Sequence, residues 1–474
     1  MEFEYPPEPA PAERAPAPPA EPAKPPDPRK RRPVVLLIVV AVLLVAAGLA
    51  ALALRGGGGA AEVGAPAGEG APTTVAGGGA SPGISSNVPP AQRRVFDELM
   101  AQVSEIRGLA WQGPLNLQVV SSAELARRFA DASERDFDPA RFAAGEATLK
   151  LLGLIPGDLD YKRLMDDLLA EAVLGFYDPE TKELFVGSDG RGELDARTRW
   201  IIVHEMTHAL TDQVFGYGPA TIRLDREDRA EELAAYSALL EGDATLAQTQ
   251  WAERHLSTAE QAALLLGGGG GSVAAFLRAP PYIRRALFFP YNEGLAFVQS
   301  LYRDGGWPAV DAAYRDPPTS TQHILEPDTY RAGRRPTPAP LPDVAAATGC
   351  TGLRTGMVGV FDMRAILDEH LPMADANRAA DSWNGDAYSL LRCGATLGFV
   401  NRWRADGTAE ATRLVDALNR WAGPWSGGRS APGADGRFTG PNGAGRIVRN
   451  GATVDIVLAE NAATADLLSR ALAG

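Results

Sequence analysis

Apolar side chains recur at helical spacing along much of the chain, and shorter apolar runs predict strands between these stretches. Within residues 91–107, Val95, Leu99 and Val103 keep the spacing of one helical face. Two apolar runs within residues 173–186 flank the turn sequence Asp-Pro-Glu-Thr and predict a β-hairpin. Further helices are expected at 124–131, 140–152, 160–171, 193–214, 226–255, 408–421 and, beginning after Pro290, within 287–302, and further strands at 115–120 and 453–458. This mixture predicts an α+β fold.

The first 88 residues have a composition that does not suit a packed core. Residues 1–33 are rich in Pro and Ala and are expected to form a disordered tail. Residues 34–54 contain no charge, and at about 1.5 Å per residue they span roughly 31 Å, which predicts a transmembrane helix. Residues 55–88 are rich in Gly, Ala, Pro and Ser and are expected to form a flexible linker.

The charges around the uncharged segment predict how it is oriented. Four cations precede it at residues 29–32, and only Arg55 follows it closely. The positive-inside rule then places the N-terminus in the cytoplasm and the folded part outside. A cleaved signal peptide is the alternative, because many small side chains follow Leu54. We therefore expect a single-pass membrane protein with an extracytoplasmic folded part.

The folded part is expected to contain two domains, residues 89–335 and residues 344–474, joined by a Pro-rich linker. The first should be mainly helical with a small hairpin or sheet. The second shows mixed helical and strand patterns, carries no chemical motif and has no role that the sequence reveals. The net charge of −13 argues against a nucleic-acid-binding surface.

Two cysteines, Cys350 and Cys393, are the whole cysteine content of the chain. Both lie in the part that is expected outside the cell, where a disulfide is allowed. Two buried free thiols are the alternative. Two cysteines this far apart exclude a CxxC-type metal site.

The sequence His204-Glu205-Met206-Thr207-His208 has the HExxH pattern. On a helix, positions i and i+4 share one face, so His204 and His208 can bind the same ion, and Glu205 can reach a water molecule at that ion. The alternative is a solvated helix that happens to contain two histidines. Apolar residues of the same segment form one side of the predicted helix, as expected of a buried helix.

A third ligand is expected from the helix at 226–255. Ala234, Ala238, Glu241 and Thr245 fall on one face, and the three small members would let this helix pack closely on another. Glu241 is the acid on that face and the preferred third ligand. The competitors are Asp243 and Asp212, and either of them could instead accept a hydrogen bond from a ligand histidine.

Three protein ligands and an open position would suit catalytic zinc, Zn2+, which lowers the pKa of a bound water towards neutrality. Glu205 would then be the general base, passing the proton on to a leaving amine. The developing oxyanion needs another donor. His323 is preferred for this role over Tyr291, Tyr314 and Tyr330, and a surface histidine without a catalytic role is its alternative.

The motif followed by Glu241 resembles the gluzincin type of zinc metallopeptidase. The stretches HEMTHALTDQ, ALLEGDAT and PPTSTQHILEPDTY, within about residues 176–330, resemble a family of bacterial membrane-anchored HExxH proteins. The resemblance implies a zincin-like catalytic domain at 89–335. Many gluzincins have an Asp four residues after the ligand Glu, where this chain has Thr245. The relatives read Leu-His-Pro where this chain has Leu325-Glu326-Pro327.

Together these observations predict a membrane-anchored, extracytoplasmic zinc metallopeptidase that hydrolyses peptide bonds in peptides or proteins. The alternative is a non-catalytic envelope scaffolding or interaction protein with a structural or degenerate metal site. A zinc amidase acting on cell-wall peptides is a third possibility. The sequence leaves the natural substrate and the oligomeric state open.

Overall fold

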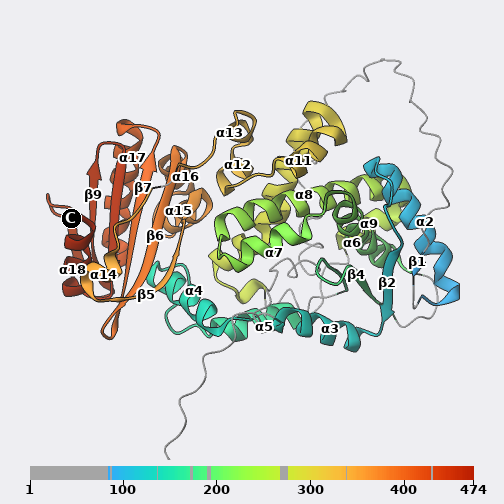
Figure 1. Ribbon diagram of the computed structural model, residues 1–474, viewed down its shortest axis with the longest axis horizontal. Coiled ribbons are helices and arrows are strands. Elements are labelled where there is room, and N and C mark those ends of the chain that lie inside the picture. The colour runs from blue at the N-terminus through green and yellow to red at the C-terminus, as the bar shows by residue number, and fades with distance from the viewer. Residues whose placement is uncertain are drawn as a thin grey trace, which may run out of the picture. The chain divides into compact units, whose positions relative to one another are not determined.

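The computed structural model describes residues 84–85, 88–135, 137–170, 174–188, 194–266, 276–337, 339–428 and 431–473. Helices and two β-sheets make up this part of the chain, which confirms the predicted α+β class (Figure 1). The predicted tail at 1–33 and almost all of the predicted linker at 55–88 lie outside the described residues. The proposed division at residues 335–344 stays a prediction.

The membrane prediction has to be corrected. The expected span, residues 34–54, lies outside the described residues. Among the residues that the structure does describe, none of the helices is both long enough and apolar enough to cross a bilayer. The expected single-pass, membrane-anchored state is therefore not supported.

A four-stranded sheet in the first half of the chain has the strand order β1-β2-β4-β3. β1 and β2 pair in parallel, as do β2 and β4, whereas β3 and β4 form the expected antiparallel hairpin. β3 therefore lies at one edge of the sheet. The strands are β1 (Ile84–Ser85), β2 (Leu115–Val120), β3 (Gly175–Asp178) and β4 (Glu183–Gly187).

Helices surround this sheet and extend beyond it. α2 begins at Pro90 and ends at Gly108, whose positive φ of 64° suits a glycine in this position. The helices of this region are α2 (Pro90–Arg107), α3 (Ser122–Glu134), α4 (Pro139–Leu151), α5 (Tyr161–Ala170), α7 (Gly218–Arg226) and α9 (Thr258–Leu266).

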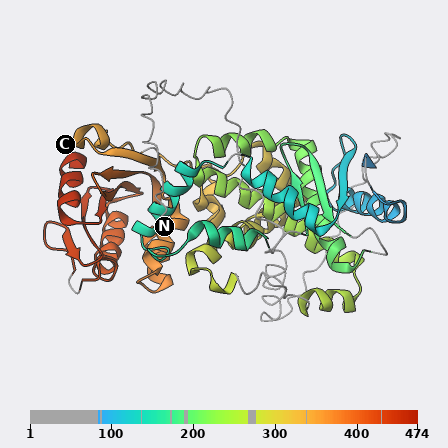
Figure 2. The same ribbon diagram turned by 90° about the horizontal axis from the view of Figure 1, so that it is seen from below.

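Three long helices pack together and carry the candidate site: α6 (Ala196–Phe215), α8 (Ala230–His255) and α11 (Pro281–Arg315) (Figures 1 and 2). α6 begins where the Asp195 side chain accepts a hydrogen bond from Thr198 N at 2.7 Å. α11 starts nine residues before Pro290 and contains it, so the helix start expected after Pro290 is wrong. Packing against α8 outweighs the backbone hydrogen bond that a proline removes.

The second sheet has six antiparallel strands in the order β5-β6-β7-β10-β9-β8. Side chains alternate between its faces, so Leu390 and Phe399 pack with α17, whereas Leu391 and Val400 pack with α18. Helices thus cover both faces of this sheet (Figure 2). The strands are β5 (Thr351–Gly356), β6 (Trp383–Cys393), β7 (Thr396–Ala405), β8 (Arg437–Gly440), β9 (Gly443–Asn450) and β10 (Thr453–Ala459).

Short helices connect the two sheets, and longer ones complete the C-terminal region. They are α12 (Thr321–Leu325), α13 (Pro327–Arg331), α14 (Val344–Thr348), α15 (Gly359–Asp368), α16 (Met373–Ala380), α17 (Thr408–Ser426) and α18 (Ala462–Ala473). Cys350 and Cys393 form a disulfide, which joins the start of β5 to the end of β6. The disulfide alternative is thereby confirmed over two free thiols.

Helix α4 belongs to the core of this second sheet although it lies early in the chain. Leu151, Leu152 and Leu154 are buried with the aromatic side chains of the sheet and of α17. The Trp425 indole N–H donates to the Leu151 carbonyl at 3.1 Å. The apolar face of the C-terminal sheet is therefore completed by residues from the first third of the chain.

Candidate metal centre

His204 and His208 occupy one buried face of α6, as the i, i+4 spacing predicts. Their Nε2 atoms are 3.0 Å apart, and the two rings meet edge to face. Every side chain of α6 from Trp200 to Asp212 is buried. The helix is therefore not a solvated one that happens to contain two histidines.

Glu241 of α8 completes a group of three ligand atoms. Its Oε2 lies 3.1 Å from His204 Nε2 and 3.4 Å from His208 Nε2. The three side chains are buried, and their ligand atoms all lie within 4.8 Å of one another, so the group could hold a metal ion. Ligands about 2.0–2.1 Å from a tetrahedral ion lie roughly 3.3 Å from each other. The observed separations fit such an ion.

Burial and mutual contact shift the pKa values of this group, and against the lowering effect of burial the charges of Glu241 and Glu205 raise the pKa of His208. Burial raises the pKa of Glu241, but the charge and hydrogen bonds of His208 and His204 outweigh it and lower the pKa to about 2. Burial raises the pKa of Glu205 to about 8, against the lowering effect of His208 and of the Tyr177 N–H. Burial lowers the pKa of His204. A divalent cation would stabilise both carboxylates in their charged form.

Glu205 is held by the edge strand of the first sheet. Its Oε2 accepts a hydrogen bond from the Tyr177 N–H of β3 at 3.0 Å, and its Oε1 is buried with no hydrogen-bond partner among the described residues. A Cβ on Gly175 would lie 3.1 Å from Phe185 O of β4, a tight contact, and 3.8 Å from Glu205 Cγ, an ordinary van der Waals distance. One carboxylate oxygen of Glu205 thus remains free for proton transfer.

Tyr291 of α11 lies beside the metal group. Its ring centroid is 6.4 Å from that of His204. The Tyr291 side chain is buried, and burial, the charges of Glu241 and Glu205 and a hydrogen bond to Glu241 raise its pKa well above the ordinary value. The hydroxyl is therefore a hydrogen-bond donor over the neutral pH range.

The other expected oxyanion donors are engaged elsewhere. His323 Nδ1 accepts from Thr319 N at 3.1 Å, and His323 Nε2 lies 2.6 Å from the Arg334 carbonyl. Both ring nitrogens of His323 are thus occupied, and the ring packs edge-on against Tyr330. The Tyr330 hydroxyl donates to the Asp316 carbonyl. The geometry favours Tyr291 over the preferred His323.

The two competing carboxylates, Asp243 and Asp212, are also engaged away from the metal group. Asp243 forms a buried ion pair with Arg107, whose Nε lies 2.8 Å from Asp243 Oδ1, and it accepts from the Tyr314 hydroxyl at 2.6 Å. Asp212 accepts from the hydroxyl of Tyr177 at 2.8 Å and from Gly218 N at 3.0 Å, and it pairs with Lys182. Glu241 is the carboxylate that joins the two histidines.

Gln248 lies one turn beyond Thr245 on α8 and was missed by sequence reasoning. Its Nε2 donates to the Trp200 carbonyl of α6 at 2.8 Å, and its side chain contacts the His204 ring. The signal that could have found it is its spacing of seven residues from Glu241, which places both on one helical face. Amide side chains are seldom considered in a metal site, so this spacing did not mark Gln248 as a candidate.

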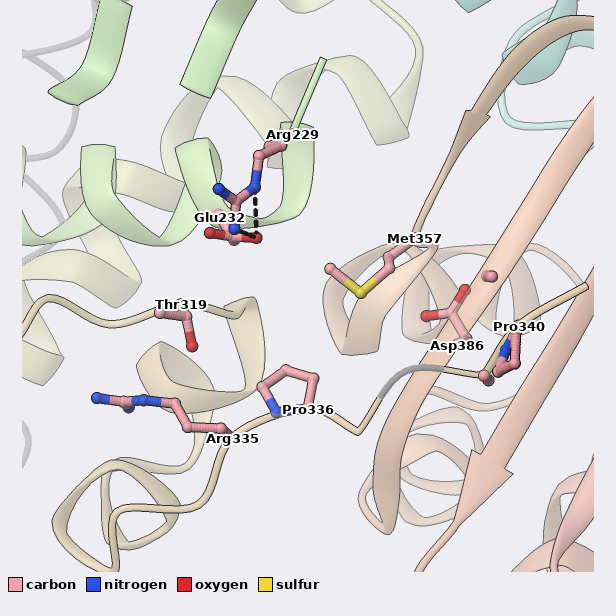
Figure 3. A pocket seen from close by; sticks show the side chains of 10 residues that line it. Arg229, Glu232, Thr319, Arg335, Pro336, Pro340, Met357 and Asp386 are labelled. Carbon is pink, nitrogen blue, oxygen red and sulfur yellow. Dashed lines mark hydrogen bonds and ion pairs between the residues drawn. The ribbon is translucent and has the colours of Figure 1, made fainter. Parts of the chain in front are cut away.

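An open pocket of about 480 Å³ lies apart from the metal group (Figure 3). Figure 3 shows Arg335 and Thr319 on one side of it, and Met357 and Asp386 on the other. Arg335 is paired with Asp316, and Arg229 is paired with Glu232, so neither cation presents a free charge. The lining residues are Arg229, Glu232, Thr319, Arg335, Pro336, Ala339, Pro340, Met357, Asp386 and Ala387.

Comparison with known proteins gives little beyond the C-terminal region. Residues 349–469 match the model of a family described as a domain of unknown function (DUF8575). No curated protein matches the chain. A solved structure from Chloroflexus aurantiacus, described as "a putative hydrolase with a novel fold", resembles 53% of this chain and 93% of its own, with 19% sequence identity and a TM-score of 0.34.

Proposed function

We propose that this protein is a zinc-dependent metallopeptidase that hydrolyses peptide bonds. The observation that carries the proposal is the buried convergence of His204, His208 and Glu241 from two helices, with Glu205 next to them. His204, His208 and Glu241 would hold the ion, and three protein ligands leave a position open, as in catalytic zinc sites. A bound zinc ion would polarise the scissile carbonyl and make a water molecule more acidic.

Glu205 would act as the general base and then as the general acid. Its free Oε1 accepts a proton from the attacking water while the water oxygen forms a bond to the carbonyl carbon. When the C–N bond breaks, Glu205 delivers that proton to the leaving amine. The backbone N–H of Tyr177 holds the other oxygen and so fixes the direction of the carboxylate throughout.

The Tyr291 hydroxyl would donate a hydrogen bond to the oxyanion that develops during the attack. A donor fixed before the reaction stabilises this charge more than water does, because it needs no reorganisation. Tyr291 is suited to this role, since its side chain is buried and sits beside His204 and Glu241.

An extended peptide is the substrate class that the surrounding fold suits best. β3 is an edge strand of the first sheet and lies next to the metal helix. Its four residues are buried and its Tyr177 N–H is bound to Glu205, so a peptide would have to pair with the remaining backbone groups of this edge. Addition of a strand to such an edge is a common way of binding peptide backbone. The same chemistry would serve a zinc amidase that acts on cell-wall peptides, and only a substrate profile distinguishes the two.

The metal content and hydrolytic activity of the full chain test the proposal. We expect about one zinc ion per chain, hydrolysis of an unstructured protein such as casein, and loss of both with a chelator. Glu205→Gln should keep the zinc and abolish hydrolysis, while Glu98→Gln, a change of an exposed acid on α2, should change neither. A full chain that binds no zinc at micromolar metal would contradict the proposal.

A structural metal site in a non-catalytic scaffolding protein is the second candidate. The observation in its favour is the depth of burial, since His204, Glu205 and Glu241 are each at most 2% exposed. A structural site would hold its zinc in a closed set of four protein ligands. Zinc binding without hydrolysis of any peptide in a broad library, and unfolding on removal of the metal, would favour this candidate.

A further inference from the structure

The second ring nitrogen of His204, Nδ1, points away from the candidate metal ligands. His204 Nδ1 is buried, and no hydrogen-bond partner meets it with full geometry in the part of the chain that the structure describes. A histidine that binds a metal through one nitrogen almost always donates a hydrogen bond from the other, which fixes the tautomer and the orientation of the ring. A buried N–H without an acceptor destabilises the folded protein.

The side chain of Gln248 supplies an acceptor at this place. Gln248 Nε2 donates to the Trp200 carbonyl at 2.8 Å, which determines which way round the amide lies. Its other atom, Oε1, is buried and likewise lacks a partner that meets full hydrogen-bond geometry among the described residues. The Gln248 side chain is also among the groups that contact the His204 ring.

The amide is fixed relative to the turn of α6 that carries His204. Trp200 precedes His204 by four residues, so its carbonyl also accepts the His204 backbone N–H in a regular helix. One end of the Gln248 amide is thus bound to the backbone of that turn, and the other end faces its side chain. The two carboxylates that the sequence offered as hydrogen-bond acceptors for a ligand histidine are already engaged. Asp212 is bound by Tyr177 and Asp243 by Arg107.

We propose that Gln248 Oε1 accepts a hydrogen bond from His204 Nδ1–H and thereby presents the Nε2 lone pair of His204 to the metal ion. This inference rests on the proposed function, and it makes Gln248 a positioning residue of the site. An amide oxygen directs the ring without adding a negative charge. His204 would therefore be oriented without a further negative charge behind it.

Zinc affinity, measured by competition with a chromophoric chelator, tests the proposal. Gln248→Leu should weaken zinc binding by about 10- to 100-fold, the usual effect of losing such a partner. Gln248→Glu keeps an acceptor oxygen at the same place. It should bind zinc at least ten times more tightly than Gln248→Leu. Gln250→Leu is the matched control, because Gln250 lies on the same helix and its Oε1 is also buried without a partner.

Two further measurements separate positioning from a structural role. The metal-free Gln248→Leu and Gln250→Leu proteins should unfold at similar temperatures, so that a difference in zinc affinity is not a difference in folding. In the zinc-loaded wild-type protein, long-range ¹H–¹⁵N NMR should show the His204 proton on Nδ1. That proton should also give an NOE to the Gln248 side-chain amide, a measurement that needs no variant and decides the matter if Gln248→Leu does not fold.

The possible failures are distinguishable. A wild-type chain that binds no zinc overturns the proposed function, and this inference with it. Wild-type binding with an unchanged affinity in Gln248→Leu, or a His204 Nδ1 proton without an NOE to the Gln248 side-chain amide, overturns the role of Gln248 and leaves the proposed function standing.

Discussion

Gly242 of α8 and Gly294 of α11 lie in direct backbone contact. A Cβ on Gly242 would lie 2.2 Å from the Gly294 carbonyl oxygen, and a Cβ on Gly294 would lie 2.2 Å from the Ala238 carbonyl oxygen. Glu241 precedes Gly242 directly, and Tyr291 lies one turn before Gly294. The two helices therefore approach this closely at the place where the third candidate ligand and the candidate oxyanion donor have to meet.

Replacement of this glycine should separate the two helices. Gly242→Ala places a methyl group against backbone that cannot rotate away, so we expect a loss of about 3 kcal/mol or more in the free energy of unfolding. Thermal and urea unfolding measure the loss. Gly113→Ala is the control, since a Cβ there meets nothing within 4 Å. Equal stability of the two variants would show that the contact is not as close as described.

Removal of the Tyr291 hydroxyl should slow the reaction without releasing the metal. For Tyr291→Phe we expect a kcat lower by about 100-fold, as for the loss of one oxyanion donor, with a nearly unchanged KM. Zinc content should stay at the wild-type level. Tyr330→Phe removes a hydroxyl that donates to the Asp316 carbonyl and should leave kcat unchanged. A Tyr291→Phe enzyme with wild-type kcat contradicts the role of this hydroxyl.

Replacing Glu241 and replacing Asp243 should have different effects on zinc content and stability. Glu241→Gln should lose zinc, because it removes the charged ligand. Asp243→Asn should keep zinc and lose stability, since it breaks the buried ion pair with Arg107, and such a loss costs about 3–5 kcal/mol. Metal analysis and urea unfolding of both variants distinguish the outcomes. If Asp243→Asn lost its zinc and Glu241→Gln kept it, Asp243 and not Glu241 would be the metal ligand.

Glu326 should make the stability depend on pH. Burial, together with the charge of Asp381, raises the pKa of Glu326 to about 7, although Arg364 lowers it. Between the ordinary value of about 4.5 and 7, the folded protein holds a proton that the unfolded chain has released. Stability should therefore fall as the pH rises through this window.

Unfolding by urea between pH 4.5 and pH 8 measures this effect. Glu326→Gln should flatten the profile, because it removes the group whose pKa differs between the two states. Asp381→Asn should also flatten it in part, since Asp381 shares Arg364 with Glu326. Parallel profiles for wild type and Glu326→Gln would show that this carboxyl does not titrate as described.

The sequence predicted the part of the site that depends on local spacing. His204, His208 and Glu205 follow from one motif on one helix, and Glu241 followed from the small residues on its helical face, of which Ala238 lies against another helix. That helix is α11. The sequence could not predict which helix packs against α8, because small residues show that some helix can approach closely but do not show where in the chain that helix lies.

The remaining contacts of the site join residues that are far apart in the chain. Arg107 reaches Asp243 across 136 residues, and no local pattern connects a basic residue at the end of one helix with an acid in the middle of another. Tyr291 was one of four candidates for the oxyanion donor, and no local pattern distinguished it from the preferred His323. Tertiary packing decided both cases.

The contact between α4 and Trp425 bears on the order in which the chain can fold. α4 is synthesised long before the six-stranded sheet. The apolar side chains of Leu151 and Leu152 therefore lack their packing partners until β5 to β10 have been synthesised. Conversely, the region that matches the family model would, on its own, expose the apolar surface that α4 covers. Completion of the C-terminal sheet therefore needs α4 from the first third of the chain.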